Sequence, residues 1–258
     1  MIDIKYFKEY RELLGFSNQN SVKSFFGAKD ITPTIDYDYI SLLNIRLFDI
    51  IIKIDNLLPF SIKCDNLNLF KDIYIDSVFE KLKCNNIVSK LNNQGRRTEE
   101  VYFSWMRGFL ISSYFLKTIG IIFDIKTENI KIIGDDDFNN LETFKRTPKA
   151  DLEIILKNNQ KLRIEIQSGF QGINDIKQHK VLEAKKNKLQ NNISSIVIHF
   201  DFFNGQVAFV NIDSIEENDI NWITRTQMEG QTVFNIDQNS FIWKLIELPP
   251  KMEDLSFL

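Results

Sequence analysis

Two short segments of alternating side chains, separated by a four-residue turn, constrain the fold of this chain more than any other feature. The first runs from Asp151 to Leu156, the second from Leu162 to Gln167, and Lys157-Asn158-Asn159-Gln160 lies between them. Such runs, bounded by turn-forming residues, predict two antiparallel strands joined as a hairpin. Because side chains alternate along a strand, Glu165 and Gln167 share one face, and the isoleucines beside them face the other way.

The segments around this hairpin predict a mixed α/β domain in which helices flank a mixed β-sheet. An apolar helix is expected from Thr98 to about Lys117, ending near Gly120. The remaining expected elements are strands at Ile121–Ile125 and Ile130–Ile133, a lysine-rich helix at Ile173–Leu189, a buried strand at Ile196–Phe200, strands at Gln206–Ile212 and Thr232–Ile236, and a terminal helix at Phe241–Leu248 before Pro249-Pro250. We interpret this order as an α-β-β-β-α-β core with a C-terminal strand extension.

Residues 1–94 are predicted to form a separate, mostly helical region. Helices are expected at Lys5–Leu14, at Tyr37–Leu57 and across Asp72–Leu91, where Cys84-Asn85-Asn86 interrupts the pattern. The boundary is placed at residue 95, because Gly95 breaks the chain before the long apolar helix. We expect this region to recognise a macromolecular partner or to form a dimer, and residues 95–258 to carry the chemistry.

Composition and charge indicate a folded, globular protein, and they leave open whether it binds nucleic acid. Hydrophobic residues make up 43% and charged residues 26% of the 258, so a folded domain is expected rather than disorder. The net charge of -3 gives no support to nucleic-acid binding, and it does not exclude it, because a divalent metal would neutralise carboxylates at a site. Cys64 and Cys84 are read as free thiols. The chain begins with charged residues and has no long apolar run, so we expect a cytoplasmic protein without a membrane partner.

The hairpin brings together residues that suit a hard metal ion. Asp151 stands at the open end of its strand, the end that lies beside Glu165 and Gln167. Two carboxylates and an amide therefore converge on one small volume, and the backbone carbonyl of Ile166 offers a third oxygen. Mg²⁺ prefers such oxygen ligands and keeps several waters, so Mg²⁺ is the expected cofactor and no organic cofactor is expected.

An aspartate entering one strand, followed after thirteen residues by Glu165-Ile166-Gln167 on the next strand, resembles the PD-(D/E)xK nuclease superfamily. The resemblance covers about residues 96–200 and includes the order of helices and strands. It implies that Asp151 and Glu165 bind Mg²⁺, that the chain cuts double-stranded DNA, and that the product carries a 5′-phosphate. Type II restriction endonucleases are the best-known members of this superfamily.

The sequence departs from the family pattern at Gln167, where a lysine is more usual. An amide cannot usefully accept a proton, so Gln167 is expected only to orient the attacking water. In some relatives the lysine comes from the following helix, which makes Lys180 a candidate and Lys177 a weaker one. Lys177 and Lys185 are also candidates for phosphate contact. Glu100 is a further catalytic candidate, because the preceding helix often supplies an acid to this type of site.

Two other places predict contact with DNA. Arg96 and Arg97 precede the long helix, where a phosphate could approach its N-terminus. Arg225, Gln227 and Gln231 belong to a polar, turn-rich stretch, and Arg and Gln are the side chains that pair bidentately with guanine and adenine.

We therefore expect a Mg²⁺-dependent type II restriction endonuclease that acts as a homodimer, since two related sites cut both strands of a palindrome most simply. A monomer that cuts one strand at a time stays open. So do two alternatives: a nuclease of the same superfamily with little sequence specificity, as in a mobile element, and a DNA-binding module whose nuclease core has decayed. Two amphipathic strands without any catalytic role would also explain the hairpin pattern. His199, inside an apolar strand, is expected to be structural.

Overall fold

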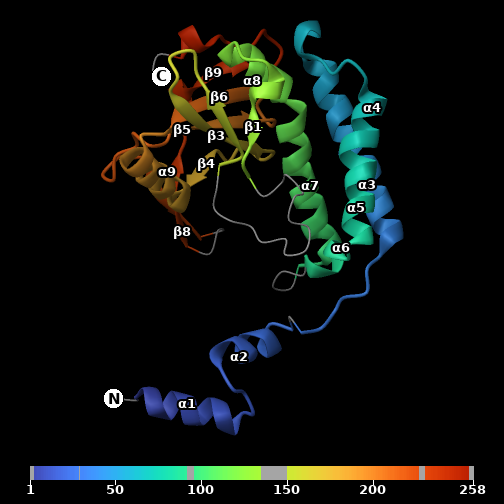
Figure 1. Ribbon diagram of the computed structural model, residues 1–258, viewed down its shortest axis with the longest axis vertical. Coiled ribbons are helices and arrows are strands. Elements are labelled where there is room, and N and C mark those ends of the chain that lie inside the picture. The colour runs from blue at the N-terminus through green and yellow to red at the C-terminus, as the bar shows by residue number, and fades with distance from the viewer. Residues whose placement is uncertain (1–2, 29, 92–95, 135–149, 227–229, 256–258) are drawn as a thin grey trace.

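The computed structural model describes residues 3–28, 30–91, 96–134, 150–226 and 230–255, and it has mixed α/β architecture. The main sheet has six strands in the order β1-β2-β3-β5-β6-β9 (Figure 1). Their bounds are β1 Lys131–Ile132, β2 Leu152–Ile155, β3 Lys161–Gly169, β5 Ser194–Asp201, β6 Gln206–Asn211 and β9 Phe241–Lys244. Neighbouring strands are antiparallel except β3 and β5, which are parallel and are joined through the helix α9, Gln178–Asn191. A second sheet contains β4 Asp175–Lys177, β8 Gln231–Asn235 and β7 Trp222–Arg225 in that order.

Alternate residues of the central strands belong to two different cores, because the side chains point to opposite faces of the sheet. Ile196 and Ile198 of β5 join the large core, which includes the helix α7, Thr98–Tyr114. Val197 between them joins a smaller core formed with α9 and the second sheet. The two helices therefore cover opposite faces of the main sheet.

A helical layer packs on the outer side of α7 (Figure 1). Its elements are α3 Tyr37–Leu57, α4 Leu67–Lys71, a π-helical turn Asp72–Asp76, α5 Ser77–Cys84 and α6 Ile87–Lys90. Tyr102 of α7 donates a hydrogen bond of 2.6 Å to Asn44 of α3 inside this interface. Residues on both sides of the predicted boundary at residue 95 thus share the large core.

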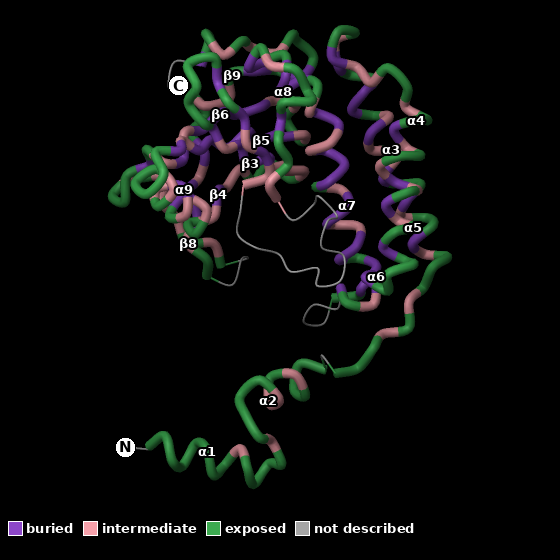
Figure 2. The backbone as a smooth tube through the Cα atoms, in the orientation of Figure 1, coloured by how far each residue is buried: buried purple, intermediate pink, exposed green. Residues whose placement is uncertain are grey.

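Two short helices precede this layer, and they lie away from the rest of the molecule (Figure 2). They are α1 Ile4–Leu13 and α2 Gln19–Phe26, and neither contains a buried residue. Asp3 caps α1 by accepting a hydrogen bond from the Tyr6 backbone N–H, and Asn18 caps α2 in the same way through Ser21. We call residues 3–28 the N-terminal arm.

Most of the predicted elements are confirmed, and α3 has the predicted bounds of Tyr37–Leu57. The α-β-β-β-α-β order is also present, as α7, β1, β2, β3, α9 and β5, with α8 and β4 added. Among the described residues no single helix is long and apolar enough to cross a membrane, although α7 and α8 together pass that test as a bent pair.

Three element predictions were wrong. The predicted strand Ile121–Ile125 is largely part of α8, Leu116–Phe123, because Ile119, Ile122 and Phe123 reach the core at helical spacing. The start of the predicted helix Ile173–Leu189 is instead the strand β4, which pairs with the distant β8.

The predicted terminal helix Phe241–Leu248 begins as the edge strand β9. Trp243 and Leu245 are both buried, which is the alternation of a strand. Strand β6 supplies hydrogen-bond partners for β9 at its open edge, with Val207 opposite Trp243. This tertiary pairing outweighs the local helical pattern.

Candidate functional site

The β2–β3 hairpin fixes Asp151 beside Glu165. The antiparallel register ends with Leu152 opposite Ile164, so Asp151 comes directly before the paired part of β2 and Glu165 directly after the paired part of β3. The backbone N–H of Ile166 donates a hydrogen bond of 2.6 Å to Oδ2 of Asp151. On the other side, the carbonyl of Asp151 accepts bonds of 2.9 and 3.2 Å from the backbone N–H groups of Ile133 and Gly134. Asp151 is therefore held in place although β2 begins only after it.

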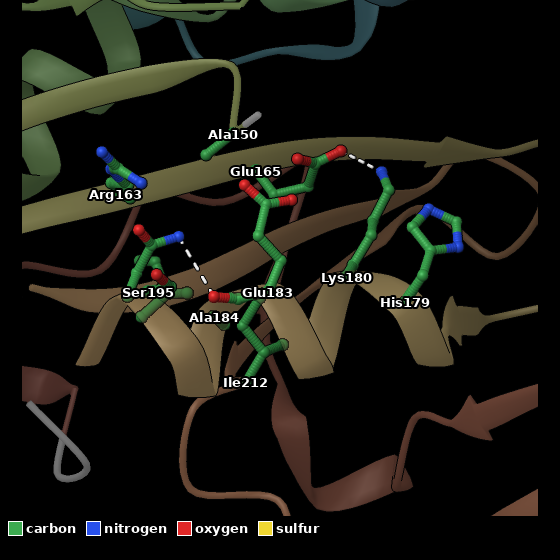
Figure 3. Close-up of a pocket in the computed structure, with 11 residues that line it drawn as sticks. Ala150, Arg163, Glu165, His179, Lys180, Glu183, Ala184, Ser195 and Ile212 are labelled. Carbon is green, nitrogen blue, oxygen red and sulfur yellow. Dashed lines mark hydrogen bonds and ion pairs between the residues drawn. The ribbon is translucent and has the colours of Figure 1, made fainter. Parts of the chain in front are cut away.

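The Glu165 carboxylate is paired with a lysine of the helix above it. Its Oε1 accepts a hydrogen bond from Nζ of Lys180 in α9, and both side chains are mostly buried (Figure 3). In the close-up, the carboxylate of Glu183, one helical turn after Lys180, points into the same space as that of Glu165. A charge-assisted bond in a partly desolvated setting orients the Glu165 carboxylate firmly.

A small pocket that is open to solvent surrounds this pair, between β3, β5 and α9 (Figure 3). Its polar lining comes from Arg163, Glu165, His179, Lys180, Glu183, Asn187 and Ser195. Arg163 lies two residues before Glu165 on the same face and pairs with Glu153 of β2 at 3.5 Å. The site thus contains acids and bases from two strands and one helix, and it opens toward solvent.

The residues present fit a divalent metal of the Mg²⁺ kind. Within the described part of the chain, no group of three or more histidine, cysteine, aspartate or glutamate side chains could hold a metal ion. Mg²⁺ does not require such a group, since it binds through one or two carboxylates, keeps several waters and takes substrate phosphates as ligands. Asp151 and Glu165 are the two carboxylates that could serve, because the Asp151 carboxylate accepts a hydrogen bond from the backbone N–H that follows Glu165. Glu165 lines the pocket beneath α9, whereas Asp151 lines a second pocket on the α7 side.

The other predicted catalytic residues lie at different distances from this pair. Gln167 is half-buried, two residues after Glu165 on the same face of β3. Ile166 gives its backbone N–H to Asp151, and its side chain faces the α7 core. Glu100 is exposed in the first turn of α7, whereas the part of α7 that lies near Asp151 begins at Phe109. Nine residues of helix correspond to about 13 Å along the axis, so Glu100 is not grouped with the carboxylate pair.

The residue next to Glu100 has a structural environment of its own. Glu99 is buried, accepts a hydrogen bond of 2.8 Å from the backbone N–H of Asp36, and pairs with Arg97 at 3.5 Å. Arg97 also lies over the ring of Tyr39, 5.0 Å from its centroid. Arg97 is thereby engaged with the α3 layer, while Arg96 is exposed.

The residues of the second sheet that were predicted to contact DNA differ in whether their side chains are available. Arg225 donates two hydrogen bonds, of 2.8 and 3.1 Å, to the buried carboxylate of Asp175, so its fork is occupied within the sheet. Gln231 is exposed on β8, and Gln227 lies outside the described residues. The remaining two candidates, Lys177 and Lys185, are both half-buried, just before and along α9.

Sequence reasoning missed two side chains that the structure brings near these strands. Glu183 follows Lys180 by three residues, and that helical spacing was the available signal. Arg107 lies in the middle of an apolar helix, where a lone arginine among aromatic residues was the signal. Its guanidinium carbon is 4.4 Å from the ring centroid of Phe170, the residue that follows β3.

His199 is buried beside Gln167 in the β3–β5 register. Its Nε2 lies 2.8 Å from Oδ1 of Asn174, and Nδ1 is buried without a hydrogen-bond partner in the described structure. Burial lowers the pKa of His199 to about 4, although the charges of Asp201 and Asp175 act in the opposite direction. The ring is therefore neutral at physiological pH.

Comparison with known proteins adds little. No protein-family model and no curated protein matches this chain. Among solved structures, it is similar to Hjc, a Holliday junction resolvase from Archaeoglobus fulgidus, with 11% sequence identity, 55% of this chain and 97% of that chain covered, and a TM-score of 0.33. A similarity of this degree carries no argument about function, which therefore rests on the chain's own residues.

Proposed function

We propose that this chain is a Mg²⁺-dependent endodeoxyribonuclease of the PD-(D/E)xK type that hydrolyses phosphodiester bonds of double-stranded DNA. The observation that supports the proposal is that the Asp151 carboxylate accepts a hydrogen bond of 2.6 Å from the backbone N–H of Ile166, the residue after Glu165 on β3. Two acids from neighbouring segments of the hairpin, with a lysine of the following helix bonded to one of them, are the parts that metal-assisted hydrolysis needs.

Asp151 and Glu165 would hold the metal, which, when bound, stabilises charge on the scissile phosphate and lowers the pKa of an attacking water. Lys180 balances the charge of Glu165, and its ammonium lies where it can orient a water or a phosphate oxygen. Gln167 has an amide, so its part is to orient the water by hydrogen bonding. Which of Lys180 and Gln167 assists the nucleophile is decided by comparing their variants.

In its finer form, the proposal is a cytoplasmic type II restriction enzyme that cuts at a short specific sequence and leaves a 5′-phosphate. The second sheet supports this form, because β8 contacts α9 and its first residue, Gln231, is exposed. Discrete fragments from a plasmid would support specific cutting, and a smear would favour the non-specific nuclease.

We also propose that the enzyme acts as a homodimer assembled through the N-terminal arm. Helices of 10 and 8 residues are too short to be stable alone in water, so their exposed apolar side chains need a partner. These side chains include Tyr6, Phe7, Tyr10, Leu13, Phe25 and Phe26. Lys5 and Lys8 are matched by Glu9 and Glu12 in ion pairs along α1, and this balance favours a protein partner over DNA.

The area of the arm is sufficient for a stable dimer. These six large side chains are between 47% and 87% exposed, and each would bury on the order of 100 Å². Two reciprocal arms and the surfaces that receive them then reach a total on the order of 2,000 Å², which is typical of stable dimers.

The test of the nuclease is cleavage of plasmid DNA with Mg²⁺ by the parent, Asp151→Asn, Glu165→Gln and Lys180→Met. Loss of either acid should reduce the rate by about a thousandfold or more, since metal assistance supplies several kcal/mol. Each variant should still bind a duplex when Mg²⁺ is withheld, which separates lost chemistry from lost folding. Cleavage that survives in both acid variants would remove the site assignment, and a parent that binds DNA without cutting it would favour the decayed module.

A further inference from the structure

Arg107 occupies an unusual position for a charged side chain. It lies on α7 with its guanidinium between two aromatic rings, 4.4 Å from the centroid of Phe170 and 5.8 Å from that of Phe103. Phe103 is one helical turn earlier on α7, and Phe170 directly follows β3. Arg107 is therefore held where α7 crosses the end of the strand that carries Glu165.

This guanidinium is half-buried and has no acid beside it. In the described part of the chain no carboxylate lies within 4.0 Å of Arg107, whereas the half-buried Arg163 and Arg225 each pair with an acid. Burial lowers the pKa of Arg107, and the positive charge of Arg96 lowers it further. The two rings offset part of the cost of desolvating this cation, and among the described residues no acid pairs with it to offset the rest.

The position of Arg107 relates it to the candidate carboxylates. Strand β3 continues beyond its last pair with β2, at Ile164, as far as Gly169. Along this stretch β5 pairs with one edge of β3, and no described strand pairs with the other edge. Phe170 comes five residues after Glu165, which is about 16 Å along a strand. That length corresponds to about five nucleotides along the axis of one DNA strand. A DNA strand cut at Glu165 that follows this edge of β3 from the α9 face toward the α7 face could thus place a neighbouring phosphate at Arg107.

We propose that Arg107 binds a backbone phosphate of the nucleic acid a few nucleotides from the bond that is cut. The planar guanidinium can donate two hydrogen bonds to phosphate oxygens, and the flanking rings hold it in position without consuming its donors. A contact of this type fixes the position of the duplex and does not read its sequence. The inference rests on the proposed function in that its ligand is DNA.

A structural role and a ligand-binding role for Arg107 predict opposite changes in the thermal stability of an Arg107 variant. If Arg107 served to stabilise α7, removing its charge would lower the melting temperature. If its charge is kept for a ligand, Arg107→Met retains the aliphatic stem between the rings and removes an unpaired buried cation. The melting temperature of the free protein should then stay the same or rise.

The experiment measures binding of the full chain to short fluorescent duplexes of several sequences, without Mg²⁺, at salt concentrations from about 50 to 200 mM. Arg46→Met is the matched control, because Arg46 is an exposed arginine on α3, far in the sequence from the site. Arg107→Met should weaken binding by roughly tenfold or more for every duplex and reduce the salt dependence by about one released ion. Arg107→Lys, which keeps the charge and loses the fork, should fall between Arg107→Met and the parent.

The outcomes separate this inference from the nuclease proposal. Arg107→Met binding like Arg46→Met, or melting well below the parent, would overturn the phosphate site and leave the nuclease untouched. A parent that binds no duplex at all would overturn both. Weakened binding with unchanged or higher thermal stability would support the phosphate site, even if the parent proved unable to cut.

Discussion

Acidification should destabilise this protein through His199, and the size of the effect follows from its surroundings. The ring is 3% exposed, and its Nε2–H donates to Oδ1 of Asn174. Protonation would place a second N–H on Nδ1, which is buried with no acceptor among the described residues. The charged form is therefore disfavoured in the folded state, in agreement with a pKa of about 4 against 6.5 for a free histidine.

Stability falls on acidification because the unfolded chain takes up the proton more readily than the folded chain does. Because the folded pKa lies below the unfolded one, the unfolded chain binds more protons between about pH 4 and pH 6.5, and stability falls as the pH falls through that window. The full effect is the difference of about 2.5 pKa units times 1.36 kcal/mol, or about 3.4 kcal/mol, reached below pH 4. By about pH 5, roughly 2 kcal/mol of it should already be lost.

The assay is urea denaturation of the parent and of His199→Gln at several pH values from about 7.5 to 5. The parent should lose about 2 kcal/mol more than the variant over this range. The chain has one other histidine, the exposed His179, so His179→Gln is the control and should keep most of the parent's pH dependence. If His199→Gln loses stability on acidification as steeply as the parent does, the reasoning about the buried ring is refuted.

Two further predictions concern the strand end and the arm. At Gly169 an added Cβ would lie 3.1 Å from a backbone carbonyl oxygen, so Gly169→Ala should lower the free energy of unfolding by about 1–3 kcal/mol in urea denaturation, and an unchanged midpoint would contradict this crowding. For the arm, sedimentation of the parent should give twice 30.3 kDa, and Phe7→Glu with Tyr10→Glu should give 30.3 kDa. The control Lys5→Gln with Lys8→Gln changes the polar face and should leave the dimer intact; a dimer that survives the glutamates would show that the arm is not the interface.

Two local features of the sequence, the alternation of side chains along a strand and the short turn of the hairpin, predicted part of the candidate site. Alternation placed Glu165 and Gln167 on one face, and the short turn placed Asp151 near them; in the structure the Asp151 carboxylate accepts a hydrogen bond from the backbone N–H of Ile166, between those two residues. The pairing of Glu165 with Lys180 depends on how α9 crosses the sheet, and helical spacing alone could only name Lys177 and Lys180 together.

The misplaced elements share a physical cause. The segment at Phe241 has apolar residues that suit a helix and a strand almost equally, and only the open edge of β6 decides for the strand. The segment at Asp175 becomes β4 because β8, some 60 residues later, provides its partner. In α8 the reverse holds, since a run of isoleucines typical of a strand is helical because it packs in the core. Partners distant in the sequence are not visible in a local pattern.

The two-residue period of β3 also limits how this protein can change length. Glu165 faces the pocket because it comes three positions after Leu162, which faces the opposite core. Deleting or inserting one residue between them would turn the acid into the hydrophobic core and an isoleucine toward the pocket. The exposed turn at Asn158 and Asn159 is free of this restriction. Descendants of this chain can therefore gain or lose residues singly at the turn, but only in pairs along the strand that leads to the acid.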